Sequence, residues 1–458
     1  MTEEPSLKRT LGTPEAVSII VGSIIGSGIF VLPAVIAGIV GSPGLVMAVW
    51  AACGVLAVFG GLTVAELGGM FPKAGGQAVF LREAWGERVA FLYGWAFFWV
   101  IQTGIIAAVA IVFSRFLAYF LGLQGVAMAP FAVQLVAVAV IVLLTAINWV
   151  GVRYGGIVSN VFTSAKLVAI LAVVAVGFFV ARGAGSILAP MLPAAAPEGG
   201  YVAAFGLALV SALFAYDGFN QAAQVAGEVK DPGRVVPRAT IAAVLLVMVV
   251  YLAATAAYLH VLPFDEVRGS ATLAADVASA ALGPVGAALI AVAVMVSTFG
   301  TVNSYVLTGP RVYYAAAEGG RLYSGFRRLH PRFATPGFGL VVQAEWACLL
   351  VLSGSYETLV NYTVVGIACF HVLMGLGLFK LRRTRPDMER PYRCWGYPVV
   401  PAVFTVVMAF IVVNGVITSP KDAGMAVLIV LSGLPFVMVA EWWQKRKERG
   451  PAAATASG

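Results

Sequence analysis

Long apolar stretches alternate with short polar segments along almost the whole chain. Most stretches reach or exceed the roughly 20 apolar residues that an α-helix needs to cross the hydrocarbon core of a bilayer. Helices satisfy their own backbone polar groups in lipid, so the pattern predicts a polytopic bundle of transmembrane helices. Twelve spans are expected, at about 13–39, 44–70, 90–121, 129–150, 156–180, from 201, 235–260, 283–317, 337–352, 358–378, 399–417 and 423–443.

Composition supports a membrane protein and excludes other classes. Apolar residues make up 60% of the 458 residues and charged residues 11%, whereas a soluble domain has about 25% charged residues. The four cysteines are scattered without a metal-binding spacing, and no phosphate-binding loop or haem motif occurs, so we expect no cofactor and no metal. The sequence also lacks the cluster of His, Asp, Glu and Cys that a membrane-embedded enzyme needs, so we expect no catalytic residues.

The basic residues indicate how the chain crosses the membrane. With the N-terminus in the cytoplasm, 24 of the 29 Lys and Arg residues fall on the cytoplasmic side and 4 on the other, while Lys166 lies within a span. Cytoplasmic loops carry such an excess, so both termini are expected in the cytoplasm. The net charge of +8 reflects these loops, and the expected partner is the lipid bilayer rather than nucleic acid.

Polar segments of different kinds separate the predicted spans. The segment 71–87 is too polar to span and is expected to be interfacial or re-entrant. The expected regions are a cytoplasmic N-terminus (1–12), the first five spans (13–180), an extracellular loop (181–200), the next five spans (201–379), a basic loop with the last two spans (380–443) and a disordered cytoplasmic tail (444–458).

The first span carries an unusual group of small residues. From Val21 to Phe30 the sequence reads V-G-S-I-I-G-S-G-I-F, with three glycines and two serines. Each glycine in a helix interior costs about 1 kcal/mol relative to alanine. One interpretation is a helix that breaks at the bilayer midplane and offers its N–H and C=O groups to a ligand. The other is a face of small residues for close helix packing.

A second interruption favours the broken helix. The sixth span contains L-F-A-Y-D-G-F-N-Q at 213–221, which places an acidic residue and a glycine at membrane depth. Spans 1 and 6 are five spans apart, an offset that reverses orientation in the membrane. Broken helices at corresponding positions of two halves point to an inverted-repeat transporter and to its binding site.

Four groups of motifs follow one another along spans 1 to 8. They are Gly22–Phe30, Ala65–Gly76 with Leu81–Gly86, Phe214–Asn220 with Glu228–Pro232, and Phe299–Asn303. Together they resemble the amino acid–polyamine–organocation superfamily, in particular its L-type amino acid transporter branch. The resemblance implies a five-plus-five inverted repeat of the leucine-transporter-like fold, with broken helices 1 and 6 and two extra C-terminal spans. It also implies amino-acid transport.

The break in span 1 has the chemistry to bind a free amino acid, which carries a carboxylate and an ammonium group on one small centre. The N–H groups at 27–29, at the positive end of the second half-helix, suit the carboxylate. The carbonyl groups at 24 and 25 suit the ammonium group, and the glycines allow close approach. The residues expected to bind substrate here are Ile24, Ile25, Gly26, Ser27, Gly28 and Ile29.

The break in span 6 is expected to complete this site. The carbonyl groups of Phe214, Ala215 and Tyr216 are matching acceptors, and Phe214 is the predicted aromatic gate, with ordinary packing as the alternative. Asp217 has two interpretations, a cap for the second half-helix, which we favour, or a partner for a cationic substrate side chain. Phe219 stands where relatives usually carry tryptophan, and this suggests room for the substrate side chain.

Lys166 is the one basic residue at membrane depth in the predicted spans. Relatives carry a similarly placed lysine whose ammonium group occupies what is a sodium site in sodium-coupled members of the superfamily. The resemblance therefore implies that Lys166 contacts carbonyl groups of span 1 and the hydroxyl groups of Ser297 and Thr298 in span 8. A structural tie to a carbonyl group is the alternative.

Three other polar residues have more local interpretations. Glu66 is expected to form an ion pair with a neighbour such as Lys73 or Lys230, and Asn303 to form a hydrogen bond between helices. His371 either relays protons or is satisfied by packing.

These observations favour a sodium-independent secondary transporter of amino acids in the plasma membrane, which works by alternating access. Exchange of neutral amino acids is the favoured mode. Proton-coupled symport, and antiport of cationic amino acids or polyamines, remain alternatives. A channel or a sensor on the same fold is a competing class, although paired broken helices favour alternating access. No accessory subunit is expected to be required.

Overall fold

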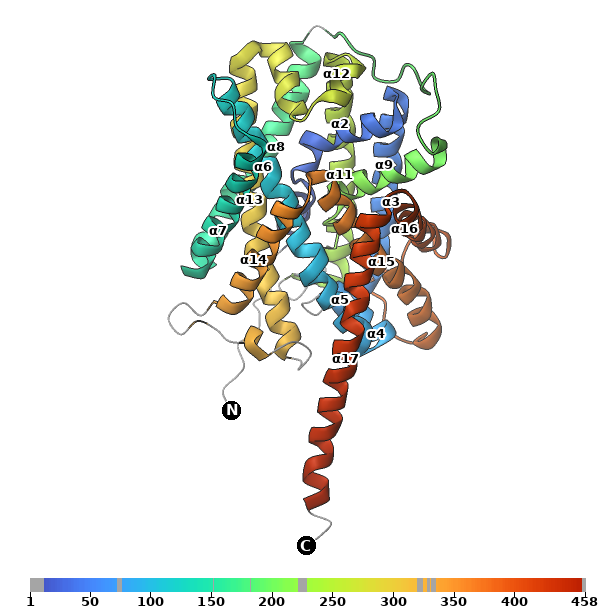
Figure 1. Ribbon diagram of the computed structural model, residues 1–458. Helices are drawn as coiled ribbons and strands as arrows, with labels where there is room; N and C mark the ends of the chain where they lie inside the picture. Colours follow the sequence, from blue (N-terminus) through green and yellow to red (C-terminus); the bar gives the residue numbers. More distant parts are fainter. Residues whose placement is uncertain are drawn as a thin grey trace.

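The protein is a bundle of helices in the computed structural model (Figure 1). The structure describes residues 12–71, 76–150, 152–181, 183–220, 229–318, 324–327, 330 and 335–454. The helices are α1 (Thr13–Ile24), α2 (Gly28–Val40), α3 (Pro43–Met70), α4 (Gln77–Trp85), α5 (Glu87–Ala96), the π-helix η1 (Phe97–Gln102), α6 (Thr103–Gly122), α7 (Pro130–Val150), α8 (Val152–Phe179), α9 (Gly200–Tyr216), α11 (Pro232–Val261), α12 (Phe264–Gly269), α13 (Leu273–Glu318), the 3-10 helix η3 (Ser324–Arg327), α14 (Gly337–Ser353), α15 (Tyr356–Thr384), α16 (Val399–Thr418) and α17 (Pro420–Ala454).

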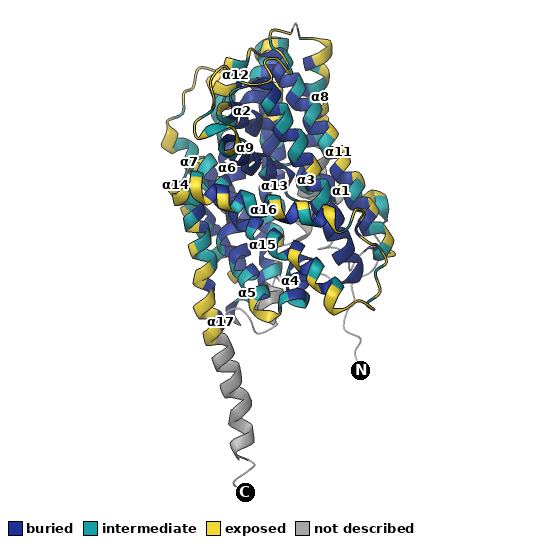
Figure 2. Ribbon diagram, turned by 90° about the vertical axis from the view of Figure 1, so that its right-hand side faces the viewer, coloured by how far each residue is buried: buried dark blue, intermediate teal, exposed yellow. Residues whose placement is uncertain are grey.

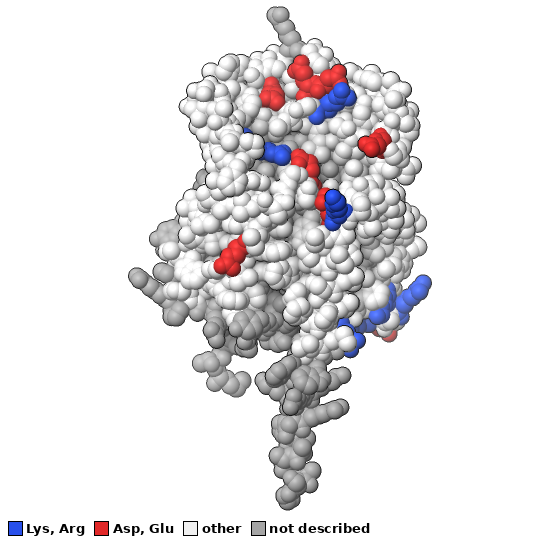
Figure 3. Space-filling view, in the orientation of Figure 1, with Lys and Arg blue, Asp and Glu red and all other residues white. Residues whose placement is uncertain are grey.

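The outer surface of the bundle is that of a membrane protein. Eight helices in the described part of the chain are long and apolar enough to cross a membrane, and the bent pair of α1 and α2 makes a possible ninth. Large apolar side chains face outward, since Phe179 is 89% exposed and Ile417 73%. Figure 2 shows that exposed residues, in yellow, lie mostly on the outer faces of the helices, and the face in Figure 3 carries only a few charged clusters among the described residues. Such a surface suits lipid. The prediction of an all-helical polytopic membrane protein is confirmed at this level.

The helices at the centre of the bundle bring the two predicted breaks together. α1 packs against α11 and α2 packs against α9, while α3 contacts both α9 and α11. α13 lies against α6 and α8, and α15 contacts α6, α9 and α16. Segments far apart in the sequence therefore surround the ends of α1, α2 and α9.

Two buried polar contacts tie distant helices. Asn148 Nδ2 of α7 donates to Asn303 Oδ1 of α13 at 2.8 Å, which confirms the predicted bond between helices. Glu66, with no exposed surface, accepts from Arg382 at 2.6 and 2.9 Å and from the backbone N–H of Cys394 at 2.6 Å. An ion pair of Glu66 was expected, but its partners are two arginines, Arg382 at the end of α15 and Arg390, whose Nε lies 3.4 Å from Glu66 Oε1.

The observed boundaries differ from the expected ones in a few places. α4 forms within the segment 71–87, and α13 has a non-helical residue, Gly283, where the eighth span was expected to begin. α17 continues as a helix to Ala454, past the expected end of the last span at 443. Residues such as Lys, Glu, Arg and Ala, which follow that point, favour helix. Residues 1–11 and 455–458 lie outside the described part of the chain. The cytoplasmic N-terminus and the disorder at the end of the tail therefore stay predictions.

Candidate functional site

The first span is interrupted at its glycines. α1 ends at Ile24, Ile25 has an extended conformation (φ −72°, ψ 93°), and α2 begins at Gly28 with its axis bent by 45° from that of α1. The first N–H groups of a helix have no partner within the helix, and the positive end of its dipole lies there. The beginning of α2 therefore presents N–H groups and the positive end of a helix dipole at the break.

α9 ends beside this interruption. Its last residue is Tyr216, after which Asp217 is extended (φ −64°, ψ 141°) and Gly218 has φ 127°. A Cβ atom on Gly218 would lie 3.0 Å from the backbone nitrogen of Ile24, and one on Gly28 would lie 2.7 Å from the Cβ of Ala215. Both positions need glycine because the ends of three helices meet at backbone distance. The continuation of the sixth span at 221–228 lies outside the described residues.

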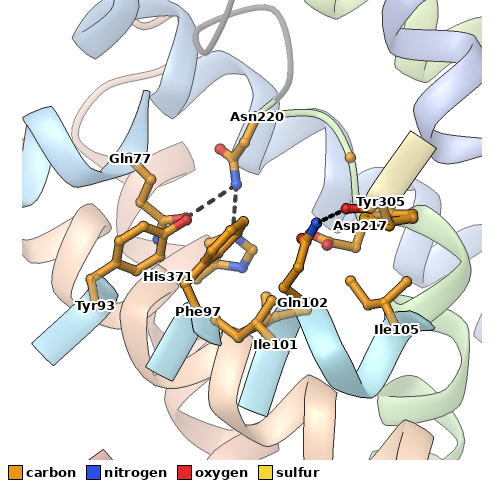
Figure 4. Close-up of a pocket in the computed structure, with 12 residues that line it drawn as sticks. Gln77, Tyr93, Phe97, Ile101, Gln102, Ile105, Asp217, Asn220, Tyr305 and His371 are labelled. Atoms are coloured by element: carbon orange, nitrogen blue, oxygen red, sulfur yellow. Dashed lines mark hydrogen bonds between the residues drawn. The ribbon is translucent and has the colours of Figure 1, made fainter. Parts of the chain in front are cut away.

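Two small cavities flank the point where these helix ends meet. The smaller, about 20 Å³, is lined by the break of span 1 and the end of α9. The larger, about 40 Å³, extends along η1 and α15 (Figure 4). Asp217 and Tyr305 line both cavities. A water molecule needs about 10–15 Å³ of cavity volume, so these two cavities have room for a few waters only. Helices must therefore separate before an amino acid can enter.

The predicted residues of span 1 divide between the cavity and its surroundings. Gly26, Ser27 and Gly28 line the smaller cavity, as does Ile24. Ile25 and Ile29 are fully buried in the core, and they are not among the lining residues. The structure thus brings together four of the six predicted positions of this break.

The predicted residues of span 6 divide in the same way. Phe214 and Ala215 line the smaller cavity, and Asp217 faces both cavities. Tyr216 turns away, since its hydroxyl group donates to the carbonyl of Trp50 at 3.3 Å. Phe219 is fully buried, with its ring centroid 5.2 Å from that of His371 and 6.3 Å from that of Phe404.

A tyrosine that the sequence did not single out connects the two breaks. The hydroxyl group of Tyr251 in α11 lies 3.0 Å from the carbonyl oxygen of Ile24 and 3.2 Å from that of Ala215. Both oxygens were expected to receive the ammonium group of a substrate. The one hydroxyl proton of Tyr251 is thus shared between acceptors at the ends of α1 and α9, and its ring packs on Trp50 and Tyr216.

Lys166 lies against the last turns of α1. Its side chain is 4% exposed, and its Nζ donates to the carbonyl oxygen of Gly22. The hydroxyl group of Thr298 instead bonds within α13, to the carbonyl of Val294 at 2.8 Å. The buried hydroxyl group of Ser297 has no hydrogen-bond partner among the described residues. The expected contact with a span 1 carbonyl is present, whereas no hydrogen bond to Ser297 or Thr298 is found within the described part.

The larger cavity contains a polar group of side chains from three helices. Asn220 Nδ2 lies 2.9 Å from His371 Nε2 of α15 and 3.4 Å from Gln77 Oε1 of α4. Gln102, in η1, donates to the carbonyl of Tyr305 at 2.6 Å. One ring nitrogen of His371 therefore has a hydrogen-bond partner, Asn220. Gln102 lies in the π-helix η1, and π-helical segments often occur at functional sites. The polar lining could not be found from sequence spacing, because its members lie on unconnected segments.

Comparison with known proteins gives a consistent family. The sequence profile of the amino acid permease family matches residues 11–439. The chain is 32% identical over 437 residues to the serine/threonine exchanger SteT of Bacillus subtilis, covering 95% of this chain and 97% of that protein. It is 33% identical to the human b(0,+)-type amino acid transporter 1 over 95% of this chain and 89% of that one. It is 31% identical to the mouse Asc-type amino acid transporter 1 over 97% and 83%. The chain therefore belongs to the amino acid permease family of membrane transporters.

Proposed function

We propose that the protein is a sodium-independent secondary transporter that exchanges amino acids across the plasma membrane by alternating access. The observation that carries the proposal is the meeting of the α1–α2 break with the end of α9 around a small cavity. N–H groups at the start of α2 would bind the substrate carboxylate. Carbonyl groups of Ile24 and Ala215 would bind the ammonium group after Tyr251 releases them.

The membrane arrangement that we propose has twelve spans and both termini in the cytoplasm. Nine spans by length and composition leave three shorter apolar helices, at 166–179, α9 and α14, to complete twelve. In this arrangement 13–180 and 201–379 form two inverted repeats, and the last two helices are additional. The protein is neither a channel nor an enzyme, and it functions without an accessory subunit.

Neutral amino acids with small side chains are the proposed substrates. The small volume of the two cavities favours a small side chain. The relative in Bacillus subtilis is named as an exchanger of serine and threonine, which supports both the substrate size and the exchange mode. Phe219 packs beside His371 and is not among the residues that line the two cavities.

Cationic amino acids are a second candidate because of Asp217. Its carboxylate borders both cavities. A charged residue at membrane depth has a high energetic cost, so its presence suggests a function. A substrate ammonium or guanidinium group in the larger cavity would pair with it. The other role of Asp217 is to cap the second half of span 6, whose residues 221–228 lie outside the described part.

We further propose that the Lys166 ammonium group takes the place of a bound sodium ion. Its contact with Gly22 fixes a positive charge at the end of α1, next to the break. A transporter with this fixed charge needs no external cation to hold the two half-helices of span 1 in place.

The decisive experiment uses the purified protein in liposomes. The lumen is loaded with one unlabelled amino acid at a time, and uptake of radiolabelled serine, leucine, lysine or arginine is followed without sodium. Uptake that requires an amino acid in the lumen is the expected result. Uptake into empty vesicles driven by an inward proton gradient would indicate proton-coupled symport instead of exchange.

The same assay separates the two substrate classes. If Asp217 receives a cationic side chain, Asp217→Asn should abolish lysine uptake and leave serine uptake within about twofold of the original rate. If Asp217 only caps the second half of span 6, both substrates should lose rate together. No uptake of any amino acid under any of these conditions would overturn the proposed function.

A further inference from the structure

A third cavity lies apart from the two deep ones and is much larger. Its volume is about 550 Å³, within the range of roughly 300–1,000 Å³ that small-molecule sites occupy. Its walls come from α2, α6, α7, the start of α15, the end of α12 and the segment 270–272 that joins α12 to α13. α12 lies at the end of the bundle opposite to the one from which α17 extends (Figure 1). We call this space the outer cavity.

An ion pair forms part of the wall of the outer cavity. Arg115 Nη1 of α6 and Glu357 Oε1 of α15 are 3.4 Å apart, and their side chains are 25% and 44% exposed. Arg268, another basic residue of the wall, is paired with Asp265 at 3.1 Å. Arg115 and Glu357 thus offer the outer cavity one positive and one negative group side by side.

A chain of side-chain contacts connects this ion pair to the deep site. The Arg115 guanidinium carbon is 5.4 Å from the ring centroid of Tyr356, which is fully buried. The ring of Tyr356 contacts that of Phe214 edge-on at 6.4 Å, and Phe214 lines the smaller deep cavity. Three layers therefore separate the outer cavity from the deep site, namely the ion pair, Tyr356 and Phe214.

The ion pair is weak enough to exchange partners. Its two contacts, 3.4 Å from Nη1 and 3.5 Å from Nη2 to the same Glu357 oxygen, are both longer than the roughly 2.7–2.9 Å of a strong charged hydrogen bond. Pairs with this much exposure contribute little stability, because water screens the charges. A zwitterion placed between the two residues would give the guanidinium a carboxylate that it can bind through two N–H groups. It would give the Glu357 carboxylate an ammonium group in the same step.

We propose that Arg115 and Glu357 form an outer binding site for zwitterionic α-amino acids. The substrate carboxylate binds Arg115 and the substrate ammonium group binds Glu357. Binding separates the pair and removes the guanidinium from the face of Tyr356, so the amino acid that is to be carried also loosens the layer above Phe214. This inference rests on the proposed transport of amino acids and adds a second, external site to it.

The test follows the accessibility of a cysteine in the outer cavity. The full chain with Ala118→Cys, a position in the wall, is placed in liposomes and labelled with a membrane-impermeant maleimide. The chain without this substitution gives the background of the four natural cysteines. L-Serine is expected to slow labelling. L-Serinamide lacks the carboxylate and 3-hydroxypropionate lacks the ammonium group, so each should need a concentration at least about tenfold higher.

Two sets of variants separate the outer site from the deep site. Arg115→Gln or Glu357→Gln should raise the L-serine concentration for half-maximal protection about tenfold or more. Arg268→Gln, the matched control in the same wall, should change it less than about twofold. Gly28→Ala, which obstructs the deep site, should leave protection of the cysteine in place.

Three results would overturn the outer site. They are the absence of protection in a chain that exchanges amino acids, unchanged protection in both the Arg115 and the Glu357 variants, and loss of protection in Gly28→Ala. Gel filtration confirms that each variant is assembled, and either of the two single variants is sufficient for the test. Failure of the proposed function itself is recognised separately, because it appears as absence of exchange by the unmodified chain.

Discussion

Replacement of Lys166 by alanine should impair exchange and make it respond to sodium. The Lys166 ammonium group is buried, and it donates to the carbonyl oxygen of Gly22, two residues before the end of α1. Lys166→Ala removes the fixed charge and leaves that carbonyl group without its donor. The half-helices of span 1 then lose a contact that ties them to α8.

The size of the effect follows from the type of contact. A hydrogen bond to a charged group contributes about 1.5–3 kcal/mol, and an unpaired buried carbonyl group has a cost of similar size. Each 1.36 kcal/mol corresponds to about a factor of ten. The exchange rate at low substrate concentration should therefore fall by about 10- to 100-fold if the transport-competent arrangement of α1 depends on this bond.

The assay compares exchange in liposomes in sodium chloride and in choline chloride. Lys166→Ala opens space in which a sodium ion can replace the ammonium group, so sodium should restore part of its rate. Lys166→Met, the matched control, fills that space with an uncharged chain and should stay insensitive to sodium. If Lys166→Ala leaves the rate, the substrate affinity and the sodium independence unchanged, the ion-replacing role is wrong.

Three further substitutions test the geometry around the breaks and the C-terminal end of α3. Gly28→Ala should abolish exchange without loss of assembly, because the new Cβ would lie 2.7 Å from that of Ala215. Tyr251→Phe should lower the exchange rate about tenfold or more, since two carbonyl groups at helix ends lose their donor. Glu66→Gln should lower the thermal stability of the purified protein, because breaking a buried ion pair costs about 3–5 kcal/mol and Arg382 loses its carboxylate.

Each of these substitutions has a matched control elsewhere in the chain. Gly38→Ala adds a Cβ with nothing within 4 Å and should leave exchange unchanged. Tyr258→Phe removes a buried hydroxyl group that has no hydrogen-bond partner among the described residues, so it should be neutral. Glu83→Gln breaks an ion pair with Arg385 that is partly exposed and should cost about 1 kcal/mol or less. Equal effects of a test variant and its control would contradict the local explanation.

The class of fold and the position of the first break could be predicted because both depend on local composition. A helix that contains Gly22, Gly26 and Gly28 within seven residues is weak at that point, and α1 does end there. The end of α9 at Tyr216 likewise falls within the predicted interruption. Runs of apolar residues indicate membrane helices with little ambiguity, since few other structures accommodate them.

The side chains that complete the site could not be predicted, because nothing in their local sequence is unusual. Tyr251 lies in an ordinary apolar segment of α11, and only the packing of α11 against α1 brings its hydroxyl group to Ile24. Gln77, Asn220 and His371 come from three separate segments and meet only in the folded chain. The type of a residue determines which interactions it can make, but its position in the fold determines which residues it interacts with.

Glu66 shows where prediction from sequence reaches its limit. A carboxylate without exposed surface needs several donors, and the sequence predicted an ion pair with a neighbour such as Lys73 or Lys230. Lys73 is near in sequence, yet a lysine supplies a single point charge. Arg382, 316 positions away, provides two hydrogen bonds in a planar fork, and the N–H of Cys394 provides a third. The sequence alone shows that a buried Glu66 needs hydrogen-bond donors. Which residues supply them depends on how α3, α15 and the loop after α15 pack together.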